Sequence, residues 1–479
     1  MSNKLQRYRN AIFPVIPRAC ICLLAIAICG CASSPARQQR TPVAIPDTWA
    51  APGSLDAAEP PAQWPRLFDD PALSRLIREA LIRNHDLRLA ATRIDTLHAE
   101  ARLAGASRLP GLDLEVTGQK GETPVEAFDQ VSTEASQSVG VSLAMHWELD
   151  VWGRLGDRYE AAWHEIRAAE ADWQAARLSL AGQVAKAWYQ IIADRLLLRL
   201  VRDTLESYQI NARIVRRHFE SGLTGALDVR LALSNVAVAE DLLQDRANRF
   251  SQSKRTLQRL LQRYPDGELE TATTLPVLGR AIPAGLPSQL LERRSDIRAA
   301  KQRLLAADRR ISEAQKAFLP DIRLTADTGT SSEKLRNVVS ADYLFWNLMA
   351  NLTQPLFAGG RLKANLALTE SAAQRAWLDY GNTVLTAFAE VELTLTAEHH
   401  LIRRLAAVEQ AVDQAVAAET LALEAYTAGV ADIITVLESQ RRVLDSKADL
   451  IRIRRQQLQN RVDIYLALGG GFERISEET

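Results

Sequence analysis

Residues 139–149 have the sequence VGVSLAMHWEL, in which every second side chain from Val139 to Leu149 is apolar. A period of two is typical of a β-strand with one apolar face. A similar alternation follows Leu109-Pro110 and Leu319-Pro320, and a less regular one occupies residues 343–354. We therefore predict four strands, near residues 112–118, 139–149, 322–328 and 343–354.

These strands are compatible with a membrane or with water. Strands of about ten residues that are apolar on one face and polar on the other are typical of a membrane β-barrel. A soluble sheet with one solvated face is the alternative. Four strands cannot close a barrel, and in a bilayer every backbone polar group must be paired. In a membrane, several copies would therefore share one barrel, and three copies would leave room for a pore.

Long stretches without proline connect the strands. No proline occurs from residue 125 to 264 or from 356 to 479. Because proline inside a helix costs about 3 kcal/mol, these stretches permit very long helices. Residues 158–221 and 363–428 would form helices of roughly 96 and 99 Å at 1.5 Å per residue. Such helices exceed a compact domain and indicate a tube or, alternatively, a dimeric coiled coil.

The same plan occurs twice along the chain. The segment DLRLA at 86–90 matches DIRAA at 296–300, and Gly222 matches Gly429 after a similar interval. A long internal repeat predicts two similar halves. The predicted segments are a signal peptide (1–30), a lipidated tether (31–63), a first repeat (64–264), an inter-repeat segment (265–286), a second repeat (287–468) and a C-terminal tail (469–479).

The N-terminus has the features of a bacterial export signal. Basic residues precede an apolar run at 20–29. This run is too short to span a bilayer, because a membrane-spanning helix needs about 20 residues. The following Gly30-Cys31 resembles the lipobox of bacterial lipoproteins, in which the cysteine thiol receives a diacylglycerol. Ala32 stands where an inner-membrane retention signal would have Asp, which implies the outer membrane. An ordinary cleaved signal with incidental cysteines is the alternative.

Other function classes lack support in the sequence. The formal net charge is +0 and there is no basic arm, which argues against nucleic acid. No G-x-x-x-x-G-K-[ST] loop is present for nucleotide hydrolysis. His399 and His400 are adjacent and would point in different directions on a helix, and Gly469-Gly470-Gly471 follows a helix as a stop signal. We predict no enzyme, no catalytic residue, no metal site and no cofactor beyond the lipid on Cys31.

Longer segments carry a family resemblance. They are FDDPALSRLIREALIRNHDLRLA (68–90), LDVWGRLGDRYEAA (149–162), LLERRSDIRAA (290–300), AFLPDIRLTADTGTSS (317–332), LTQPLFAGGRL (352–362), AFAEVE (387–392) and YLALGGG (465–471). With these segments the chain resembles the outer-membrane factor family of TolC-like and OprM-like efflux channels, in particular the NodT-type lipoproteins. Ser295 departs from the family pattern, which has Pro there, and this is expected to loosen a helix start.

The resemblance implies a mainly α fold with a membrane β-barrel, in a homotrimer. Twelve strands would form the outer-membrane barrel, the long helices a periplasmic α-barrel, and residues near 264–286 and 469–479 part of an equatorial belt. It implies passive export of drugs or other small molecules, with a periplasmic adaptor and an inner-membrane pump of the RND type as partners. The exit duct of a type I protein-secretion system is one alternative. A non-conducting coiled-coil lipoprotein scaffold is another.

The resemblance also implies a gate at the helix–helix turns. Alignment with the family places Ile434, Thr435 and Glu438 at a constriction. Ile434 and Glu438 share one helix face, so three copies would form an apolar ring and an acidic ring. Alternatively, Ile434 is ordinary helix packing and Glu438 a solvated charge. Expected adaptor contacts are Gly222, Thr224, Leu227, Gly429 and Asp432, while Asp228 is expected to cap a helix start.

Overall fold

A computed structural model of the chain describes residues 43–51, 68–127, 130–278 and 285–470. The predicted signal peptide, Cys31 and most of the predicted tether lie outside these residues. The chain divides into residues 1–42 and 43–479, and the architecture below concerns the second unit alone.

The helices form two series of matched length. The first series is α2 (Pro71–Arg83), α3 (His85–Ala106), α4 (Arg154–Glu220) and α5 (Ala226–Leu260). The second series is α6 (Pro287–Arg293), α7 (Ser295–Lys316), α8 (Arg361–Thr427) and α9 (Ile433–Ala467). Helices α3 and α7 have 22 residues each, α4 and α8 have 67, and α5 and α9 have 35. The repeated plan seen in the sequence is therefore a repeated set of helices.

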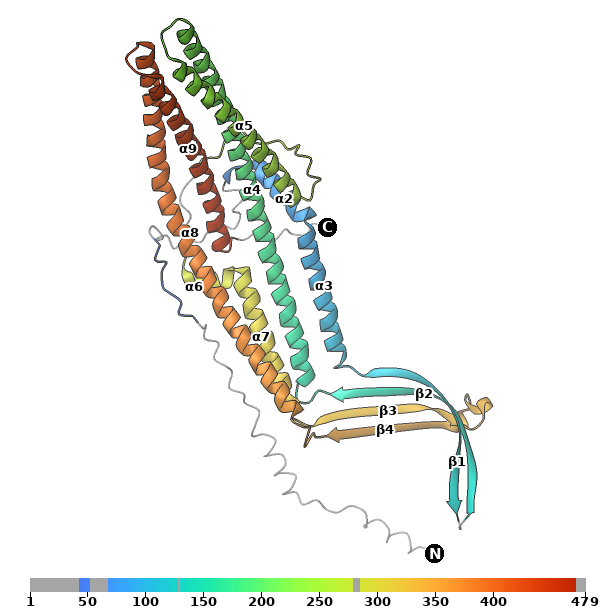
Figure 1. The fold of residues 1–479 in the computed structure, drawn as a ribbon. Coiled ribbons are helices and arrows are strands. Elements are labelled where there is room, and N and C mark those ends of the chain that lie inside the picture. Colours follow the sequence, from blue (N-terminus) through green and yellow to red (C-terminus); the bar gives the residue numbers. More distant parts are fainter. Residues whose placement is uncertain (1–42, 52–67, 128–129, 279–284, 471–479) are drawn as a thin grey trace, which may run out of the picture. The chain divides into compact units, whose positions relative to one another are not determined.

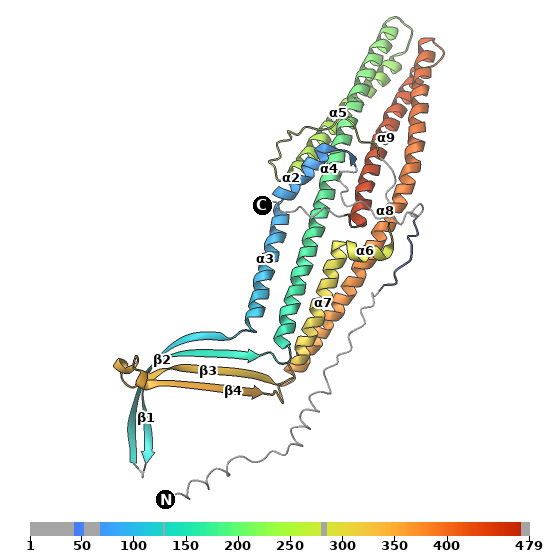
Figure 2. The same ribbon diagram turned by 180° about the vertical axis from the view of Figure 1, so that it is seen from behind.

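The long helices confirm the expectation drawn from the proline-free stretches. Helices α4 and α8 start and end within four residues of the predicted bounds. At 1.5 Å per residue each is about 100 Å long. Helix α5 returns along α4, and α9 returns along α8 (Figures 1 and 2). Among the described residues, no helix has the length and hydropathy of a membrane-spanning segment.

The two halves contribute to one antiparallel sheet. Its strands, in spatial order, are β1 (Gly111–Ala127), β2 (Gln130–Leu149), β3 (Asp321–Ser332) and β4 (Leu344–Thr353). Between β3 and β4 the chain forms the short 3₁₀ turns η2 (Leu335–Asn337) and η3 (Ala341–Tyr343). All three strand pairs are antiparallel, so β2 and β3 join the halves at the centre of the sheet.

The register gathers the apolar side chains on one face of the sheet. Directly paired residues project to the same side, so each row across the strands shares a face. One row contains Leu112, Met145, Ala326 and Leu348, and its neighbours have the same apolar character. The opposite face has rows such as Asp113, Ala144, Asp327 and Asn347. The register therefore aligns the alternating apolar residues of the four strands into one continuous apolar face.

The apolar face is uncovered within the described chain. Leu114 is 71% exposed, Trp346 77% and Leu348 63%. A soluble sheet would bury such side chains, because each gains roughly 2 kcal/mol from full burial. The exposure therefore favours the membrane interpretation over the soluble one.

Strands β1 and β2 are longer than the predicted 112–118 and 139–149. Their pairing continues from Gly118↔Val139 to Ala127↔Gln130, whereas the pairing of β2 with β3 stops at Val139↔Ser332. The hydrophobic alternation marks only the four-stranded part. Backbone pairing continues the two-stranded ribbon, and a search for apolar periodicity does not detect such pairing.

A compact turn joins β2 to α4. The Asp150 carboxylate accepts hydrogen bonds from the backbone N–H groups of Leu155 (2.9 Å) and Gly156 (2.7 Å). Gly153 adopts the left-handed conformation with a φ of 72°, which a side chain would strain. Trp152 Nε1 donates to the carbonyl of Pro320 at 2.7 Å. This bond joins the strand–helix turn of the first half to the helix–strand turn of the second.

Two buried clusters hold the helices together near their middle. The larger cluster combines α2, α4, α5 and α9 around the fully buried Tyr189, Leu257 and Leu458. The second packs α7, α8 and α9 against Trp49 through Ile297 and Val384. The larger cluster contains residues of both halves, so it holds the halves together.

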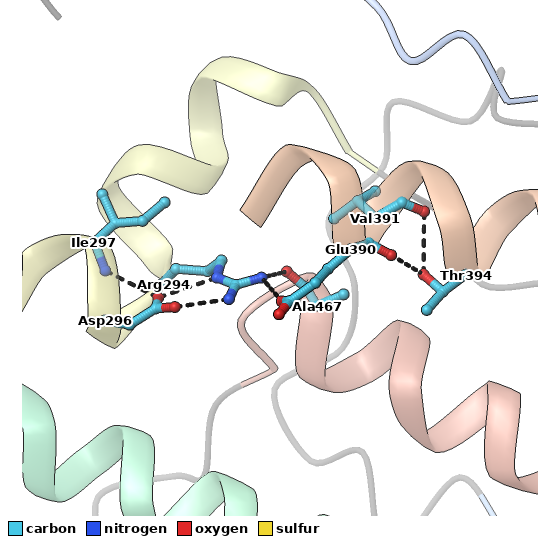
Figure 3. Close-up of polar contacts among 7 residues, drawn as sticks. All are labelled: Arg294, Asp296, Ile297, Glu390, Val391, Thr394 and Ala467. Carbon is cyan, nitrogen blue, oxygen red and sulfur yellow. Dashed lines mark hydrogen bonds and ion pairs between the residues drawn. The ribbon is translucent and has the colours of Figure 1, made fainter. Parts of the chain in front are cut away.

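Arg294 is a polar junction beside the second cluster (Figure 3). Its side chain is 9% exposed and forms ion pairs with Asp296 and Glu390, each at 2.7 Å. Its Nη1 also donates to the carbonyl of Ala467, the last residue of α9, at 3.1 Å. One guanidinium therefore connects α7, α8 and the end of α9. Helix α7 begins directly after it at Ser295, so the absence of proline there does not remove the helix start.

The predicted helix stop at the C-terminal glycines is confirmed for the described part. Helix α9 ends at Ala467, and Gly469 has a φ of 69°. The Gly470 N–H donates to the carbonyl of Tyr465 at 2.8 Å, which satisfies one of the free carbonyls at the helix end.

Replacing Arg294 by Met should lower the free energy of unfolding by roughly 2 kcal/mol, because it removes the donor to the buried Ala467 carbonyl and the cation that pairs with Asp296 and Glu390. Denaturant unfolding in detergent measures the change. The control is Arg303→Met, whose ion pair with Asp172 is about half exposed on both sides and should cost less than about 1 kcal/mol. Equal losses in the two variants would contradict the junction.

Candidate functional site

The turn between α4 and α5, residues 221–225, is called the first turn. Gly222 has a φ of 74°, and the Leu223 N–H donates to the carbonyl of His218 at 2.8 Å. This is the left-handed helix ending that glycine favours. Gly225 is the N-cap of α5 and provides no side-chain cap. The predicted cap, Asp228, is wrong: it lies inside the first turn of α5, where its charge faces the positive end of the helix dipole.

The turn between α8 and α9, residues 428–432, is called the second turn. Gly429 has a φ of 75°, and the Val430 N–H donates to the carbonyl of Ala425 at 2.9 Å. Here a side chain does cap the next helix. Asp432 accepts hydrogen bonds from the N–H of Thr435 at 3.0 Å and from its hydroxyl at 2.9 Å. The backbone N–H of Thr435 lowers the pKa of Asp432, so the carboxylate is charged at neutral pH.

The two turns present similar apolar side chains to the outside. Leu223 and Val430 are mostly exposed at the turns themselves, as are Leu227 and, to a lesser degree, Ile434 in the helices that follow. Each of these pairs is separated by the interval that separates Gly222 from Gly429. The internal repeat thus includes the exposed tips.

Below the turns, the two hairpins pack against each other. Ile433, Val436 and Leu437 of α9 contact Ala212 and Val215 of α4, together with Ala232 and Ala422. The rings of His218 and Tyr426 stack with centroids 5.9 Å apart. Burial raises the pKa of Tyr426, and the charge of Asp228 adds to the effect. The turns are therefore held at the end of one packed unit.

The predicted gate residues have distinct surroundings. Ile434 is 52% exposed, whereas its neighbour Ile433 is 2% exposed and belongs to the core. Ile434 therefore lies outside the packed core of a single copy, and its role as a gate residue stays a prediction. The Glu438 side chain is 51% exposed and pairs with Arg441 at 3.1 Å. Thr435 is bonded to Asp432, so its first role is in the helix cap.

The predicted adaptor contacts lie at the same end. Gly222 and Thr224 belong to the first turn, Gly429 and Asp432 to the second, and Leu227 to the start of α5. The Thr224 hydroxyl is enclosed and finds no hydrogen-bond partner among the described residues. The structure brings these residues together at one end, while their roles stay predictions.

The sequence reasoning missed the polar groups that hold the helices in place. Arg294 lies inside the segment LLERRSDIRAA, in which the sequence analysis assigned an effect only to Ser295. Asp157 is 5% exposed and pairs with Lys316 at 2.5 Å across α4 and α7. The sequence signal for this ion pair was an acidic residue on a helix face otherwise rich in Ala. It did not identify the partner, because Lys316 lies far along the chain.

The described residues contain no cluster of His, Cys, Asp and Glu that could hold a metal ion. The rings of His399 and His400 are 5.6 Å apart and nearly perpendicular.

Comparison with known proteins places these features in a family. The family model "Outer membrane efflux protein" matches residues 76–262 and 286–470. The solvent efflux pump outer membrane protein SrpC of Pseudomonas putida is 33% identical over 423 residues, which cover 88% of this chain and 89% of SrpC. The chain belongs to the outer membrane efflux protein family, as its resemblance implied.

Solved structures agree. A membrane protein from Pseudomonas aeruginosa has a TM-score of 0.84 and 31% identity, covering 92% of this chain and 100% of that one. The open state of the MtrE outer membrane channel of Neisseria gonorrhoeae has a TM-score of 0.80 and 28% identity, covering 91% and 97%. The protein is therefore located in the outer membrane, with its helices forming a periplasmic tunnel. Its relatives are efflux components rather than enzymes.

Replacing Gly429 by Ala should destabilise the second turn by about 1 kcal/mol, because only the backbone conformation opposes the new methyl group. No atom lies within 4 Å of an added Cβ. Hydrogen exchange of the amides at 425–435 should become several-fold faster. Gly429→Asn is the control and should have a smaller effect, since Asn tolerates the left-handed region. Equal acceleration by Ala and Asn would argue against a backbone origin.

Proposed function

We propose that three copies of this chain form a passive export channel for small molecules across the outer membrane. The observation that carries the proposal is the sheet: its apolar face is uncovered and its edge strands β1 and β4 have no outer neighbour in the described chain. A bilayer forbids unpaired strand edges, so copies must join edge to edge. Three copies provide twelve strands, enough for an open interior.

The channel interior follows from the polar face. With the apolar rows toward lipid, Asp113, Asp327 and Asn347 face the lumen, where water solvates them. The long helices then continue the wall of this lumen through the periplasm. One copy alone defines neither a closed wall nor a pore. We therefore propose a homotrimer, in which three copies complete the wall.

The periplasmic end is the proposed gate. In three copies Ile434 forms an apolar ring, which closes a narrow pore by excluding water. Glu438 forms an acidic ring on the same helix face, and Thr435 supports it from the helix cap. The exposure of Ile434 leaves its side chain available to meet the same residue of other copies.

The partners are a periplasmic adaptor and an inner-membrane pump of the RND type. The exposed tips at Leu227, Gly222 and Gly429 offer the adaptor a surface, with Thr224 and Asp432 as polar contacts. The relatives include a solvent efflux pump outer membrane protein, toluene efflux proteins and a pyoverdine export protein. These names support small molecules as cargo over the proteins of a type I secretion system, and a duct over a non-conducting scaffold.

Replacing both Ile434 and Glu438 by Ala should increase single-channel conductance in planar bilayers several-fold, because the narrowest rings lose bulk and charge. The same variant should leak antibiotic into cells. Ile402→Ala, which changes an exposed isoleucine on α8, is the control and should leave conductance unchanged. If the gate variant conducts like the native channel, these residues do not form the constriction.

The lipid anchor on Cys31 is also a proposal. Lipid on a single thiol, with further acyl chains, would hold the N-terminus in the membrane. Replacing Cys31 by Ser should abolish incorporation of radiolabelled palmitate. Replacing Cys29 by Ser should leave the label in place. Undiminished labelling of the Cys31 variant would exclude the lipobox assignment.

A further inference from the structure

The internal repeat holds residue by residue in the sheet. Gly111 of β1 lies opposite His146 of β2, and Asp321 of β3 lies opposite Thr353 of β4. From 111 to 321 is 210 residues, and from 146 to 353 is 207 residues. The matched segments DLRLA and DIRAA are also 210 residues apart, and the glycines of the two turns are 207 apart. Residues related by these intervals are called counterparts: α3 and β1 correspond to α7 and β3, and β2 and α4 correspond to β4 and α8.

The central strand pair has no counterpart within one copy. β2 pairs with β3, and Met145 lies opposite Ala326. The counterparts of these two strands are β4 and β1, which are the outer strands of the sheet. The counterpart of Met145 is Leu352, and that of Ala326 is Val116. The repeat therefore defines a register for β4 of one copy against β1 of another, with Leu352 opposite Val116.

This register keeps the apolar side chains together. Val116 lies opposite Val141 in the apolar rows, and Leu352 lies opposite Ile322. Directly paired residues project to the same side, so Leu352 opposite Val116 continues the apolar face from one copy to the next. A slip of one residue would turn the apolar rows of one copy toward the polar face of the other.

The long helices have the same arrangement as the strands. Helix α4 contacts α3 and α7, and α7 also contacts α8, so the four helices lie side by side in the order α3, α4, α7, α8 (Figures 1 and 2). The counterparts of α4 and α7 are α8 and α3, which are the outer helices of this row. The contact of α4 with α7 within a copy therefore predicts a contact of α8 with α3 between copies.

Burial in a single copy agrees with an interface at the outer helices. Ala299 of α7 and Ala161 of α4 are buried, at 0% and 3% exposed. Their counterparts are Leu89 of α3 and Leu368 of α8, and both of these larger side chains are mostly exposed. The outer helices thus present apolar side chains to the outside at positions that the inner helices bury.

One ion pair of the α4–α7 contact has counterparts of the same charge. Arg303 of α7 pairs with Asp172 of α4. Burial raises the pKa of Asp172, while the charge of Arg303 lowers it and that of Arg93 lowers it less. The counterparts of Arg303 and Asp172 are Arg93 of α3 and Asp379 of α8, and both are exposed. A contact of α8 with α3 would therefore bring opposite charges together.

Other acidic residues of the α4–α7 contact have small counterparts. Three of them on α4 pair with cations of α7: Asp157, Glu160 and Glu165. Their counterparts on α8 are all alanine: Ala364, Ala367 and Ala372. Small side chains let two helices approach closely, but they do not select one axial position. The pair of Asp379 with Arg93 is suited to make that selection.

We propose that neighbouring copies join head to tail in this register, with β4 pairing with β1, α8 packing on α3, and Asp379 forming an ion pair with Arg93 of the next copy. The inference rests on the proposed trimer and adds to it which surfaces meet and at which residues. Each step from copy to copy then repeats the step from half to half within a copy.

Disulfide formation in the full-length protein tests the strand register. Leu352→Cys combined with Val116→Cys should give covalent dimers and trimers on oxidation, because the two residues lie opposite each other between copies. Within one copy the outer strands are about 14 Å apart, too far for a disulfide. Leu352→Cys with Leu112→Cys is the matched control, since Leu112 is exposed on the same face but about 13 Å further along β1. It should give several-fold less product.

Charge exchange tests the helix contact. Asp379→Arg should reduce the fraction of trimer measured by native mass spectrometry in detergent several-fold, and adding Arg93→Asp should restore it. Asp379→Asn removes the charge alone and should have a smaller effect in the same direction. Glu409→Arg is the control, because Glu409 of α8 pairs with Arg454 of its own copy at 3.0 Å, and it should leave the trimer intact.

The outcomes separate this inference from the proposed function. More product from Leu112 than from Val116, or no rescue by the exchanged charges, would overturn the register while a trimer by mass keeps the shared channel. A monomer by mass for the native chain, with no covalent product between copies, would overturn both.

Discussion

Backbone pairing is the constraint on which this structure depends. Four strands from the two halves of the chain form one sheet. In the described chain, the N–H and C=O groups along the outer edges of β1 and β4 have no strand to pair with. In water such edges are exposed to solvent, but in a bilayer each unpaired group costs several kcal/mol. In the proposed membrane arrangement, a sheet with these open edges would need the edges of other copies to pair with.

The internal repeat serves this constraint. Each half supplies two strands, a 67-residue helix and a 35-residue return helix. The two halves differ in the residue that caps their return helix. The second turn has Asp432 as a true helix cap, while the first turn has Gly225 at the same place. The second turn is therefore more firmly fixed by side-chain hydrogen bonds and carries the only acidic residue of the two at this position.

Much of this architecture could be predicted from local patterns. The period of two in VGVSLAMHWEL and the absence of proline gave strands and helices close to those observed. Asp228 was misassigned because the N-cap depends on where the helix begins, and α5 begins three residues earlier than a cap at Asp228 would require, with Gly225 as its N-cap. The ribbon beyond Val139 was missed because backbone pairing leaves no trace in side-chain hydropathy. Arg294 was missed because its hydrogen-bond partners Glu390 and Ala467 lie about 96 and 173 residues further along the chain.

The two-stranded ribbon of β1 and β2 beyond Val139 has a consequence for evolution. In its described side chains, residues 119–124 and 133–137 bury almost nothing, and the ladder between them consists mainly of backbone pairing. Substitutions there change stability little, so selection on folding is weak. By the same argument, a short insertion in this ribbon should disturb the four-stranded part of the sheet little.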